Sequence, residues 1–521
     1  MKVKNMISLA MFAMMTVACG SGTNEIPDVP GNDIPGGEIT KPSTQKKNPA
    51  MADIINVNKK IVDDLKDKLS QGKVELSSYF NDYTYLNSTF KNNQYIIQFA
   101  DGTTTIVDLN NYSVSSRSEG SSCSRAVTAS RTEEKENMFS NSKVFLWEPL
   151  PAGALVDQQI GNLLEDYVGA ENVERITGKA CTWQAFMELP EHAIVILNGL
   201  GADGKWVVTG QEYESTLDYS TMKDCIGIYT AVVNNQVKHY FMVNDTFIAQ
   251  YMAPIVDRGL VINAASSSAS GSQLSAAFAK LGYTTYIGFD NTVPAEWAAE
   301  NIGKCLASLM QERTTTGESF AAMEAFHEFK LNDTDVKVAP VLTGDENLRC
   351  PYTAYTDRMA VTSILEHYGC DDTWSYESLL AGGKLVLDYE KRINMLDLSG
   401  CGLEGEVSEK FQWLDQLYML TLNDNQLSGE IPAFLGEYPH MSGLMLHDNL
   451  FTGTVPATFE RYYTNNGFVN LAGNKMDGKI PFGKYADGNM FFQFDHKYVY
   501  NIDGTTTTND HGLWFADEPI K

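Results

Sequence analysis

Basic residues are scarce in this sequence. Its 521 residues include 39 Lys and Arg against 66 Asp and Glu, so the formal net charge is −27. Contacts to nucleic-acid phosphates require a basic surface, and this balance therefore argues against nucleic acid as a partner. Hydrophobic residues make up 43% of the chain, which is enough to form cores. At roughly 150 residues per domain, the length indicates about two to four domains.

Long hydrophobic runs are missing as well. The apolar-biased stretch at residues 6–18 is shorter than the roughly 20 residues that span a bilayer, and no other stretch is long and apolar enough. It follows two lysines and ends in Thr16-Val-Ala-Cys19. This arrangement resembles a bacterial lipoprotein signal peptide with its lipobox. The resemblance implies cleavage before Cys19 and lipidation of its thiol, whereas the alternative is an ordinary secretory signal that is cut nearby.

The segments at the N-terminus are assigned accordingly. Residues 1–18 are expected to be the signal peptide, and residues 19–50, rich in Gly, Pro, Asn and Ser, a flexible tether. We therefore expect a protein of the cell envelope, on the surface or the periplasmic face of an outer membrane. Its contact with the membrane would be the lipid anchor alone.

Closely spaced cysteines are also absent. Beyond Cys19, seven cysteines are scattered without any CxxC spacing, so neither a zinc site nor any other cofactor is expected. An odd number in an exported protein leaves at least one cysteine unpaired if the others all pair. Cys350 and Cys370 flank a helical pattern and are candidates for a disulfide.

Residues 51–110 read as a small α+β module. A helical pattern covers residues 52–70, and residues 95–109 read as a β-hairpin with Asp101-Gly102 at its turn. The module resembles hairpin modules near the start of Bacteroidetes surface lipoproteins. The polar, Ser-rich residues 111–139 are expected to be a linker.

Residues 140–352 alternate between strand and helix patterns, which favours a mostly parallel sheet with flanking helices. A buried strand at residues 260–263 ends in small residues, and a helical pattern follows at 273–281. In open α/β sheets, the edge at which such strands end is the usual place for ligands and chemistry.

Three motifs in this region carry a resemblance to a known clan. They are Leu197-Asn198-Gly199, Asn263-Ala264-Ala265-Ser266 and the Gly344-Asp345 segment within residues 341–349. Their order resembles the caspase-like clan of cysteine peptidases that contains gingipains and clostripain. The resemblance implies a caspase-like α/β fold, with a catalytic His expected at position 198 and a catalytic Cys at position 265.

Both catalytic side chains of that clan are missing here. Asn198 does not titrate and cannot act as a general base, and Ala265 has no nucleophile. Ser266 is a weak alternative nucleophile that would need a base within about 3 Å, for which His239 would have to fold back. We therefore predict an inactive scaffold. A peptidase with displaced catalytic residues and an ordinary α/β domain remain the alternatives.

Four segments near the C-terminus share one template. They start at Leu396, Leu420, Leu444 and Val469, with spacings of 24, 24 and 25 residues, and the later ones end in Gly-x-Ile/Val-Pro. This is the pattern of leucine-rich repeats, and the ending resembles the plant-type subclass. The side chains expected to bond the turn backbone are Cys401, Asn425, Asn449 and Asn474. We assign residues 353–392 to an N-terminal cap, 393–489 to the repeats and 490–521 to a C-terminal cap.

Side chains at alternate positions of the repeat strands are expected to face outward on the concave side. The candidate binding residues are Asp397, Ser399, Thr421, Asn423, Met445, His447, Asn470 and Ala472. Such arrays usually present a binding surface, and the alternative is a solvated face on a structural spacer. The expected function is binding of a protein, peptide or glycan without catalysis. The alternative is a cysteine- or serine-type peptidase of the caspase-like clan.

Overall fold

The computed structural model describes most of the chain. It covers residues 46–518 apart from 67, 69–73, 113–137, 150–157, 216, 218–219, 255, 332–333, 372, 485–490 and 502–504. The expected signal peptide, Cys19, most of the tether and most of the 111–139 linker lie outside these residues. Within the described part, no helix is both long enough and apolar enough to cross a membrane.

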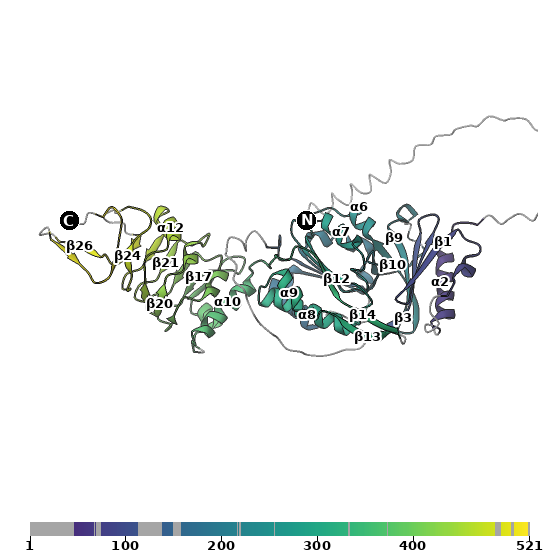
Figure 1. Ribbon diagram of the computed structural model, residues 1–521, viewed down its shortest axis with the longest axis horizontal. Helices are drawn as coiled ribbons and strands as arrows, with labels where there is room; N and C mark the ends of the chain where they lie inside the picture. Colours follow the sequence, from purple (N-terminus) through teal and green to yellow (C-terminus); the bar gives the residue numbers. More distant parts are fainter. Residues whose placement is uncertain are drawn as a thin grey trace, which may run out of the picture. The chain divides into compact units, whose positions relative to one another are not determined.

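The N-terminal helix and hairpin are part of a larger, seven-stranded sheet (Figure 1). Helix α2 (Met51–Leu65) buries its apolar stripe against this sheet, and Asn58 on the same stripe donates to Thr105 Oγ1 and Thr230 Oγ1 at 2.7 and 2.9 Å. From one edge of the sheet to the other, its strands are β1 (Tyr85–Lys91), β2 (Gln94–Phe99), β3 (Thr104–Tyr112), β9 (Ile226–Val233), β10 (Gln236–Asn244), β8 (Trp206–Glu212) and β7 (Gly201–Ala202).

Residues 51–110 therefore do not form a sheet of their own, contrary to the expectation of a separate module. The predicted hairpin is β2 and β3, with Gly102 at φ 87° in its turn. The sequence reading missed β1, which pairs with β2 through a turn at Asn92 and Asn93, both at positive φ. It also missed the parallel pairing of β3 with β9, which joins segments more than 100 residues apart.

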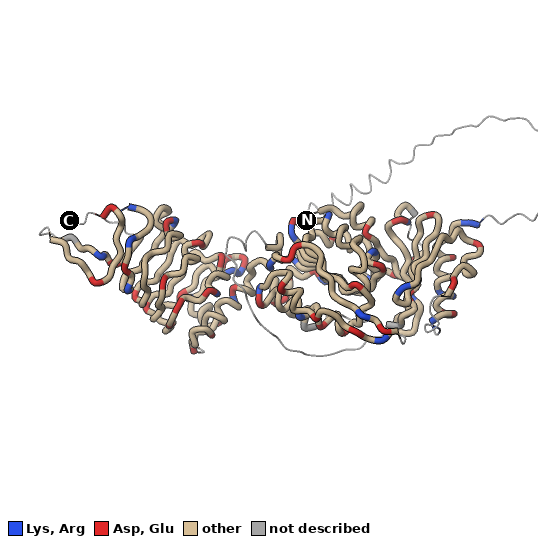
Figure 2. Tube along the Cα trace, in the orientation of Figure 1, with Lys and Arg blue, Asp and Glu red and all other residues tan. Residues whose placement is uncertain are grey.

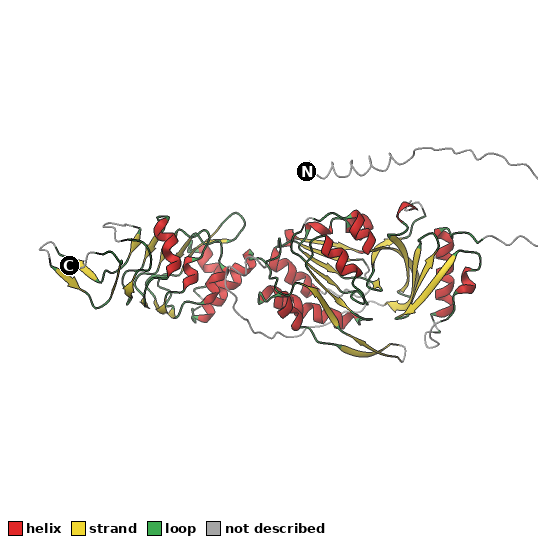
Figure 3. Cartoon of the chain, turned by 45° about the horizontal axis from the view of Figure 1, so that its top comes forward, coloured by secondary structure: helices red, strands yellow, loops and turns green. Residues whose placement is uncertain are grey.

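A six-stranded sheet forms the centre of the α/β region, as the alternating pattern predicts (Figure 3). All strands are parallel except β15, which pairs antiparallel with β12. Its inner strands are buried throughout, as in sheets that are covered on both faces. The order is β15 (Pro340–Gly344), β12 (Thr285–Phe289), β11 (Leu260–Asn263), β6 (Ile194–Leu197), β4 (Val144–Glu148) and β5 (Val173–Thr177).

Helices and one hairpin surround this sheet. The fully buried Trp147 stands in its core, and α8 (Ala295–Gln311), the longest helix among the described residues, contributes Ile302, Leu306 and Leu309. The remaining elements of the region are α4 (Gln158–Val168), α5 (Trp183–Phe186), α6 (Asp245–Tyr251), α7 (Gln273–Lys280), α8 (Ala295–Gln311), α9 (Thr316–Ala321), β13 (His327–Leu331) and β14 (Thr334–Val338).

The C-terminal region is a leucine-rich-repeat solenoid, which confirms the repeat prediction. Equivalent leucines of successive repeats lie side by side on parallel strands of one sheet, Leu396 beside Leu420 and Leu420 beside Leu444. This sheet contains β16 (Leu385–Leu387), β17 (Ile393–Asp397), β19 (Met419–Thr421), β21 (Gly443–Met445), β23 (Phe468–Asn470) and β25 (Phe492–Gln493). A second sheet contains β18 (Glu404–Gly405), β20 (Gln426–Glu430) and β22 (Leu450–Thr452).

Both ends of the solenoid carry further elements. Before the repeats stand α10 (Ala354–His367) and α11 (Tyr376–Ala381), and within them α12 (Glu460–Thr464). At the far end, β24 (Asp477–Lys479) pairs with β28 (Gly512–Trp514), and β26 (Tyr498–Tyr500) pairs with β27 (Thr506–Thr508). The aromatic side chains of Phe492 and Phe515 close the repeat core at this end.

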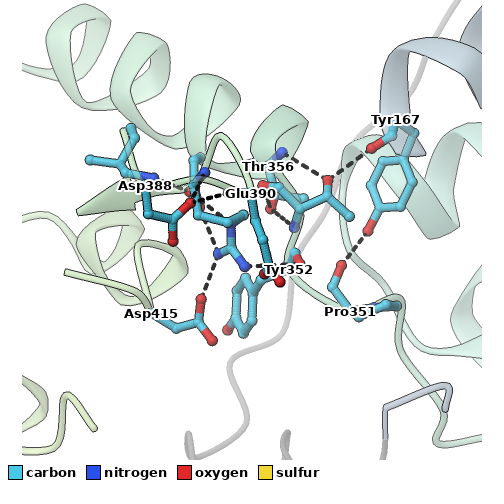
Figure 4. Close-up of polar contacts among 11 residues, drawn as sticks. Tyr167, Pro351, Tyr352, Thr356, Asp388, Glu390 and Asp415 are labelled. Atoms are coloured by element: carbon cyan, nitrogen blue, oxygen red, sulfur yellow. Dashed lines mark hydrogen bonds and ion pairs between the residues drawn. The ribbon is translucent and has the colours of Figure 1, made fainter. Parts of the chain in front are cut away.

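A buried ion pair ties the cap helix to the first repeat (Figure 4). The Arg392 guanidinium donates to both carboxylate oxygens of Asp357, on α10, at 2.8 and 2.9 Å, and to Asp415 at 2.5 Å. Just before α10 begins, Tyr167 donates to the carbonyl of Pro351 at 2.7 Å, while Thr353 donates to the carbonyl of Tyr167 at 2.8 Å. Hydrogen bonds therefore connect α4 to the cap and the cap to the repeats.

Candidate functional site

The residues expected at a catalytic dyad lie at one edge of the six-stranded sheet. Strands β6 and β11 are adjacent and parallel, with Leu197 paired to Asn263. The amide of Ala264 donates to the carbonyl of Leu197 at 2.9 Å. Asn198 and Ala265 thus follow neighbouring strands at the same carboxyl edge.

Asn198 is held in a buried polar cluster. It is 4% exposed, and its Nδ2 donates to Glu148 Oε1 at 3.2 Å, while Glu148 forms an ion pair with Arg175 at 2.5 Å. The Asn198 Oδ1 atom is buried and has no hydrogen-bond partner among the described residues. In this arrangement Asn198 supports a carboxylate and presents no general base.

The position of Ala265 is filled by protein. Ala265 is 4% exposed, and its amide donates to Asn263 Oδ1 at 3.1 Å. Strand β7 packs on it so closely that a Cβ atom on Gly201 would lie 3.0 Å from the Ala265 Cβ. The expected nucleophile position is therefore buried against β7.

The three serines after Ala265 stabilise the turn that they form. Ser266 Oγ accepts the amide of Val293 at 3.1 Å. Ser267, at φ 56°, accepts Asn92 Nδ2 at 2.9 Å, and Ser268 Oγ donates to the carbonyl of Asn263 at 2.9 Å. Each hydroxyl therefore takes part in a hydrogen bond within the protein.

The β1–β2 hairpin covers this edge. Its turn residue Asn92 makes the contact to Ser267 just described, and Gln94 Nε2 donates to the carbonyl of Gly201 at 3.3 Å. Gln94 also reaches Asp108 Oδ2 at 2.9 Å and the Tyr229 hydroxyl at 3.0 Å. Sequence reasoning missed the contacts to Ser267, Gly201 and Tyr229 because each of them joins residues more than 100 positions apart.

His239, which was considered as a base, and His192, which lies nearer to Asn198 in the sequence, both have other partners. His192 precedes β6 and is buried, with Nε2 3.2 Å from Glu174 Oε2, and desolvation lowers its pKa. His239 Nδ1 lies 2.9 Å from Thr230 Oγ1, beside α2, and burial lowers its pKa to about 4. In the described part of the chain, no cluster of three or more His, Cys, Asp or Glu side chains could hold a metal ion.

Cys350 and Cys370, the candidates for a disulfide, do not lie together. Cys350 is fully buried in the α/β core near Cys305, and burial raises the pKa of both thiols to about 12. Cys370 instead faces Cys401, with their sulfur atoms 3.1 Å apart. Sequence separation alone suggested the wrong partner, because Cys350 belongs to the core of the preceding region.

The outer face of the repeat sheet is open, in contrast to the strand edge. Its strands alternate between buried leucines and partly exposed side chains. All eight predicted face residues are partly exposed, and the register brings Asp397, Thr421, Met445 and Asn470 into one row across the strands. A second row, two residues after the first and just beyond the end of each strand, consists of Ser399, Asn423, His447 and Ala472.

An apolar row on the same face was missed by the sequence reading. It occupies the position just before the first leucine of each repeat, where Met395 pairs with Met419 and Gly443 pairs with Phe468. The exposed fractions are 40% for Val386, 37% for Phe468 and 47% for Phe491. Because Gly443 has no side chain, Met419 lies over it. The sequence signal that could have predicted this row is the apolar residue that precedes the first leucine in several repeats.

Acidic side chains border the other side of the face. Asp424 and Asp448 stand at positive φ in successive repeat turns, and Asp448 Oδ2 lies 2.8 Å from His447 Nδ1. Asp397, in the first outward row, and Asp495, in the C-terminal cap, each accept a backbone amide. Figure 2 shows how acidic positions recur along the repeats.

Asparagine side chains hold successive repeats together. Asn425 Nδ2 donates to the carbonyl of Leu398 in the preceding repeat at 2.9 Å, and its Oδ1 accepts the amide of Gly402 at 2.8 Å. Asn449 and Asn474 repeat this pattern one and two turns later. The repeat register and these bonds therefore identify the solenoid without reference to any other protein.

No protein-family model and no curated protein matches the sequence. Solved structures that match include the Arabidopsis receptor kinase HAESA in complex with the peptide hormone IDA and the co-receptor SERK1, at 28% identity and a TM-score of 0.16. This match covers 18% of the present chain and 15% of the HAESA chain. The BIR2 ectodomain from Arabidopsis thaliana matches at 21% identity and a TM-score of 0.21, over 27% of the present chain and 92% of its own.

A third match is the leucine-rich-repeat ectodomain of the receptor kinase SOBIR1, also from Arabidopsis thaliana. It is 20% identical, has a TM-score of 0.21, and covers 25% of the present chain and 73% of its own. The present chain thus spans only a small part of HAESA.

Proposed function

We propose that this protein is a non-catalytic lipoprotein of the cell envelope that binds an extended, basic segment of a protein partner. The binding surface is the outer face of the repeat sheet. Cys19 carries the lipid anchor, and the α/β region is an inactive caspase-like scaffold.

One observation carries the proposal: the repeat face is open along its whole length, whereas the strand-end site is closed. At the closed site, Asn198 and Ala265 are each 4% exposed. On the open face, Phe468 and Phe491 are more than a third exposed and unusually apolar for a solvated surface. A binding protein needs an accessible surface, which favours the repeats.

The chemistry of the face favours an extended basic partner. An apolar row runs along one side, and the exposed Asp424 and Asp448 border the other. The Lys384 ammonium beside the first strand lies over the Trp374 ring, 4.3 Å from its centroid. An extended segment that alternates apolar and basic side chains would contact the apolar row and the acidic residues at the same time. Attraction between the opposite charges would also speed its association.

Model peptides can test this proposal on the full chain. The probes are an extended peptide of alternating Leu and Lys, the same peptide with Glu in place of Lys, and a neutral β-glucan oligosaccharide. We expect the Lys peptide to bind with an affinity that falls as salt is raised, because salt screens exposed charges. Equal binding of the Glu peptide, or binding of the glucan alone, would overturn the proposal.

Substitutions on the face test which of its residues contribute to binding of the Lys peptide. Phe468→Ser should weaken binding about tenfold, which corresponds to about 1.4 kcal/mol. Combining Asp424→Asn with Asp448→Asn should remove most of the salt dependence. Tyr389→Ser, an exposed aromatic residue outside the apolar row, and Glu409→Gln, on a 3-10 turn outside the repeat sheet, are matched controls that should bind as the wild type does.

The anchor and the scaffold have separate support. The lipobox-like Thr16-Val-Ala-Cys19 supports the anchor. The three clan-like motifs and the placement of Asn198 and Ala265 after adjacent strands support a caspase-like origin. Incorporation of a labelled fatty acid that a Cys19→Ala change abolishes is the expected result for the anchor.

A further inference from the structure

We infer that Cys370 and Cys401 are a site of covalent modification and form a disulfide that joins the N-terminal cap to the first repeat. Their sulfur atoms are 3.1 Å apart, about 1 Å more than a disulfide bond of about 2.05 Å. Both side chains are partly buried against the core of the repeats. Small rotations of two side chains are therefore enough to close the bond.

The backbone on each side is fixed without help from the sulfur atoms. The amide of Cys370 donates to the carbonyl of Leu365 at 2.9 Å, at the end of α10. The Tyr368 hydroxyl donates to the carbonyl of Glu406 at 2.7 Å and accepts the amide of Ser408 at 2.8 Å. These bonds attach the end of the cap helix to the first repeat beside the two cysteines.

The turn that carries Cys401 is equally constrained. Gly400 and Gly402 flank it at φ 65° and 79°. The amide of Gly400 donates to the carbonyl of Asn423 at 3.1 Å, and the amide of Gly402 donates to Asn425 Oδ1 at 2.8 Å. Hydrogen bonds to the second repeat thus hold the turn that carries Cys401 in place beside the cap.

The place of Cys401 in the repeat pattern explains why a cysteine fits there. Later repeats have Asn at this position, and that Asn bonds to the backbone of the preceding repeat. The first repeat has no preceding repeat, so an Asn at position 401 would lack those acceptors. A covalent bond to the cap takes over the same role of joining each turn to the structure before it.

The reaction is a thiol–disulfide exchange with an oxidant of the disulfide class, either a protein dithiol oxidant or oxidised glutathione. The thiolate of one cysteine attacks the oxidant disulfide and releases one of its sulfurs as a thiol. The second cysteine loses its proton to water and attacks the mixed disulfide, releasing the other thiol. Two protons and two electrons leave the cysteine pair, and both sulfurs of the oxidant are reduced.

Peptide mapping of the full chain tests the bond directly. Trypsin places Cys370 in the peptide 359–384 and Cys401 in the peptide 393–410, because cleavage sites follow Arg358, Lys384, Arg392 and Lys410. Protein treated with oxidised glutathione and then alkylated should yield these two peptides linked, with the loss of two hydrogen atoms. Alkylation of both cysteines after this treatment would overturn the proposal, as would linkage of either one to another cysteine.

Thermal unfolding provides a second readout. The bond closes a loop between residues 31 positions apart, so the repeats of the oxidised protein should unfold about 8 °C above those of the reduced protein. Cys370→Ser and Cys401→Asn should each abolish this difference. Cys181→Ser is the control, since its hydroxyl can donate to the Ile176 carbonyl as the thiol does, and it should keep the difference. An unchanged difference in Cys370→Ser would contradict the assignment.

Discussion

The six-stranded sheet of the α/β region and the six-stranded sheet of the repeats are both built almost entirely from parallel strands, but they expose different parts of those strands. In the α/β sheet, the inner strands β4, β6, β11 and β12 are buried at every position. In the repeat sheet, buried leucines alternate with partly exposed residues. A sheet buried on both faces can act only at its edge, whereas a sheet buried on one face offers the other along its whole length.

The edge of the α/β sheet is closed by residues from distant parts of the chain. Asn92 and Gln94 reach it from the N-terminal hairpin, and Gly201 packs on Ala265. The face of the repeat sheet has no such cover within the described residues. Polar side chains at the edge of the α/β sheet are therefore hydrogen-bonded within the protein, whereas polar side chains on the repeat face are accessible to a partner.

The largest effect should come from breaking the buried ion pair between the cap helix and the first repeat. Asp357→Ala leaves the buried Arg392 without its main partner and should lower the free energy of unfolding by about 3 kcal/mol or more. Arg358→Ala removes the neighbouring exposed pair with Glu377 and should cost less than about 1 kcal/mol. Urea denaturation of both variants measures the difference, and equal losses would show that burial of the pair is unimportant.

Acid should affect the α/β region before the repeats. The pKa of His239 falls from 6.5 to about 4 on folding because of burial, so neutral His239 stabilises the fold above pH 6.5. This contribution is lost as the pH falls from 6.5 to about 4, up to roughly 3 kcal/mol at about 1.4 kcal/mol for each unit of pKa. His192, whose pKa is also lowered, adds in the same direction.

Measuring unfolding as a function of pH checks this expectation. His239→Gln should flatten the loss of stability between pH 6.5 and 4, because glutamine has no proton to gain. An identical pH profile in wild type and variant would show that His239 does not contribute.

The repeats should depend on their buried asparagines and tolerate changes on their face. Asn449→Ala removes bonds to Leu422 and Leu427 and should cost about 1–3 kcal/mol, because buried backbone groups lose their partners. Asn470→Ala, on the outer face, removes only the acceptor of the Ala472 amide and should cost less, at most about 1 kcal/mol. A larger loss for Asn470→Ala would mean that the face is structural and not a binding surface.

The smallest effect is expected at the serine turn. The chain should remain unlabelled by serine- and thiol-directed active-site probes, and Ser266→Ala should not alter labelling, because Ser266 serves to accept the amide of Val293. Specific labelling that Ser266→Ala abolishes would instead establish the peptidase alternative. The same variant should lower stability slightly through the loss of that hydrogen bond.

Local periodicity determined how far the sequence could be interpreted. The spacing of Leu396, Leu420 and Leu444 fixes which side chains are buried and which face outward, so the solenoid could be predicted with its register. The strands of the six-stranded sheet could be recognised from their apolar runs. The β3–β9 pairing, the contact of Asn92 with Ser267 and the approach of Cys370 to Cys401 depend on chain paths that no local pattern encodes.

The direction of the asparagine bonds has a consequence for how the solenoid is assembled. Asn425, Asn449 and Asn474 each bond backward, to the repeat that precedes them in the chain. A chain that emerges from its N-terminus during synthesis or export presents the cap first. Each later repeat then meets carbonyl and amide groups that are already in place. The solenoid can therefore grow one turn at a time in the order in which it emerges, without waiting for its C-terminus.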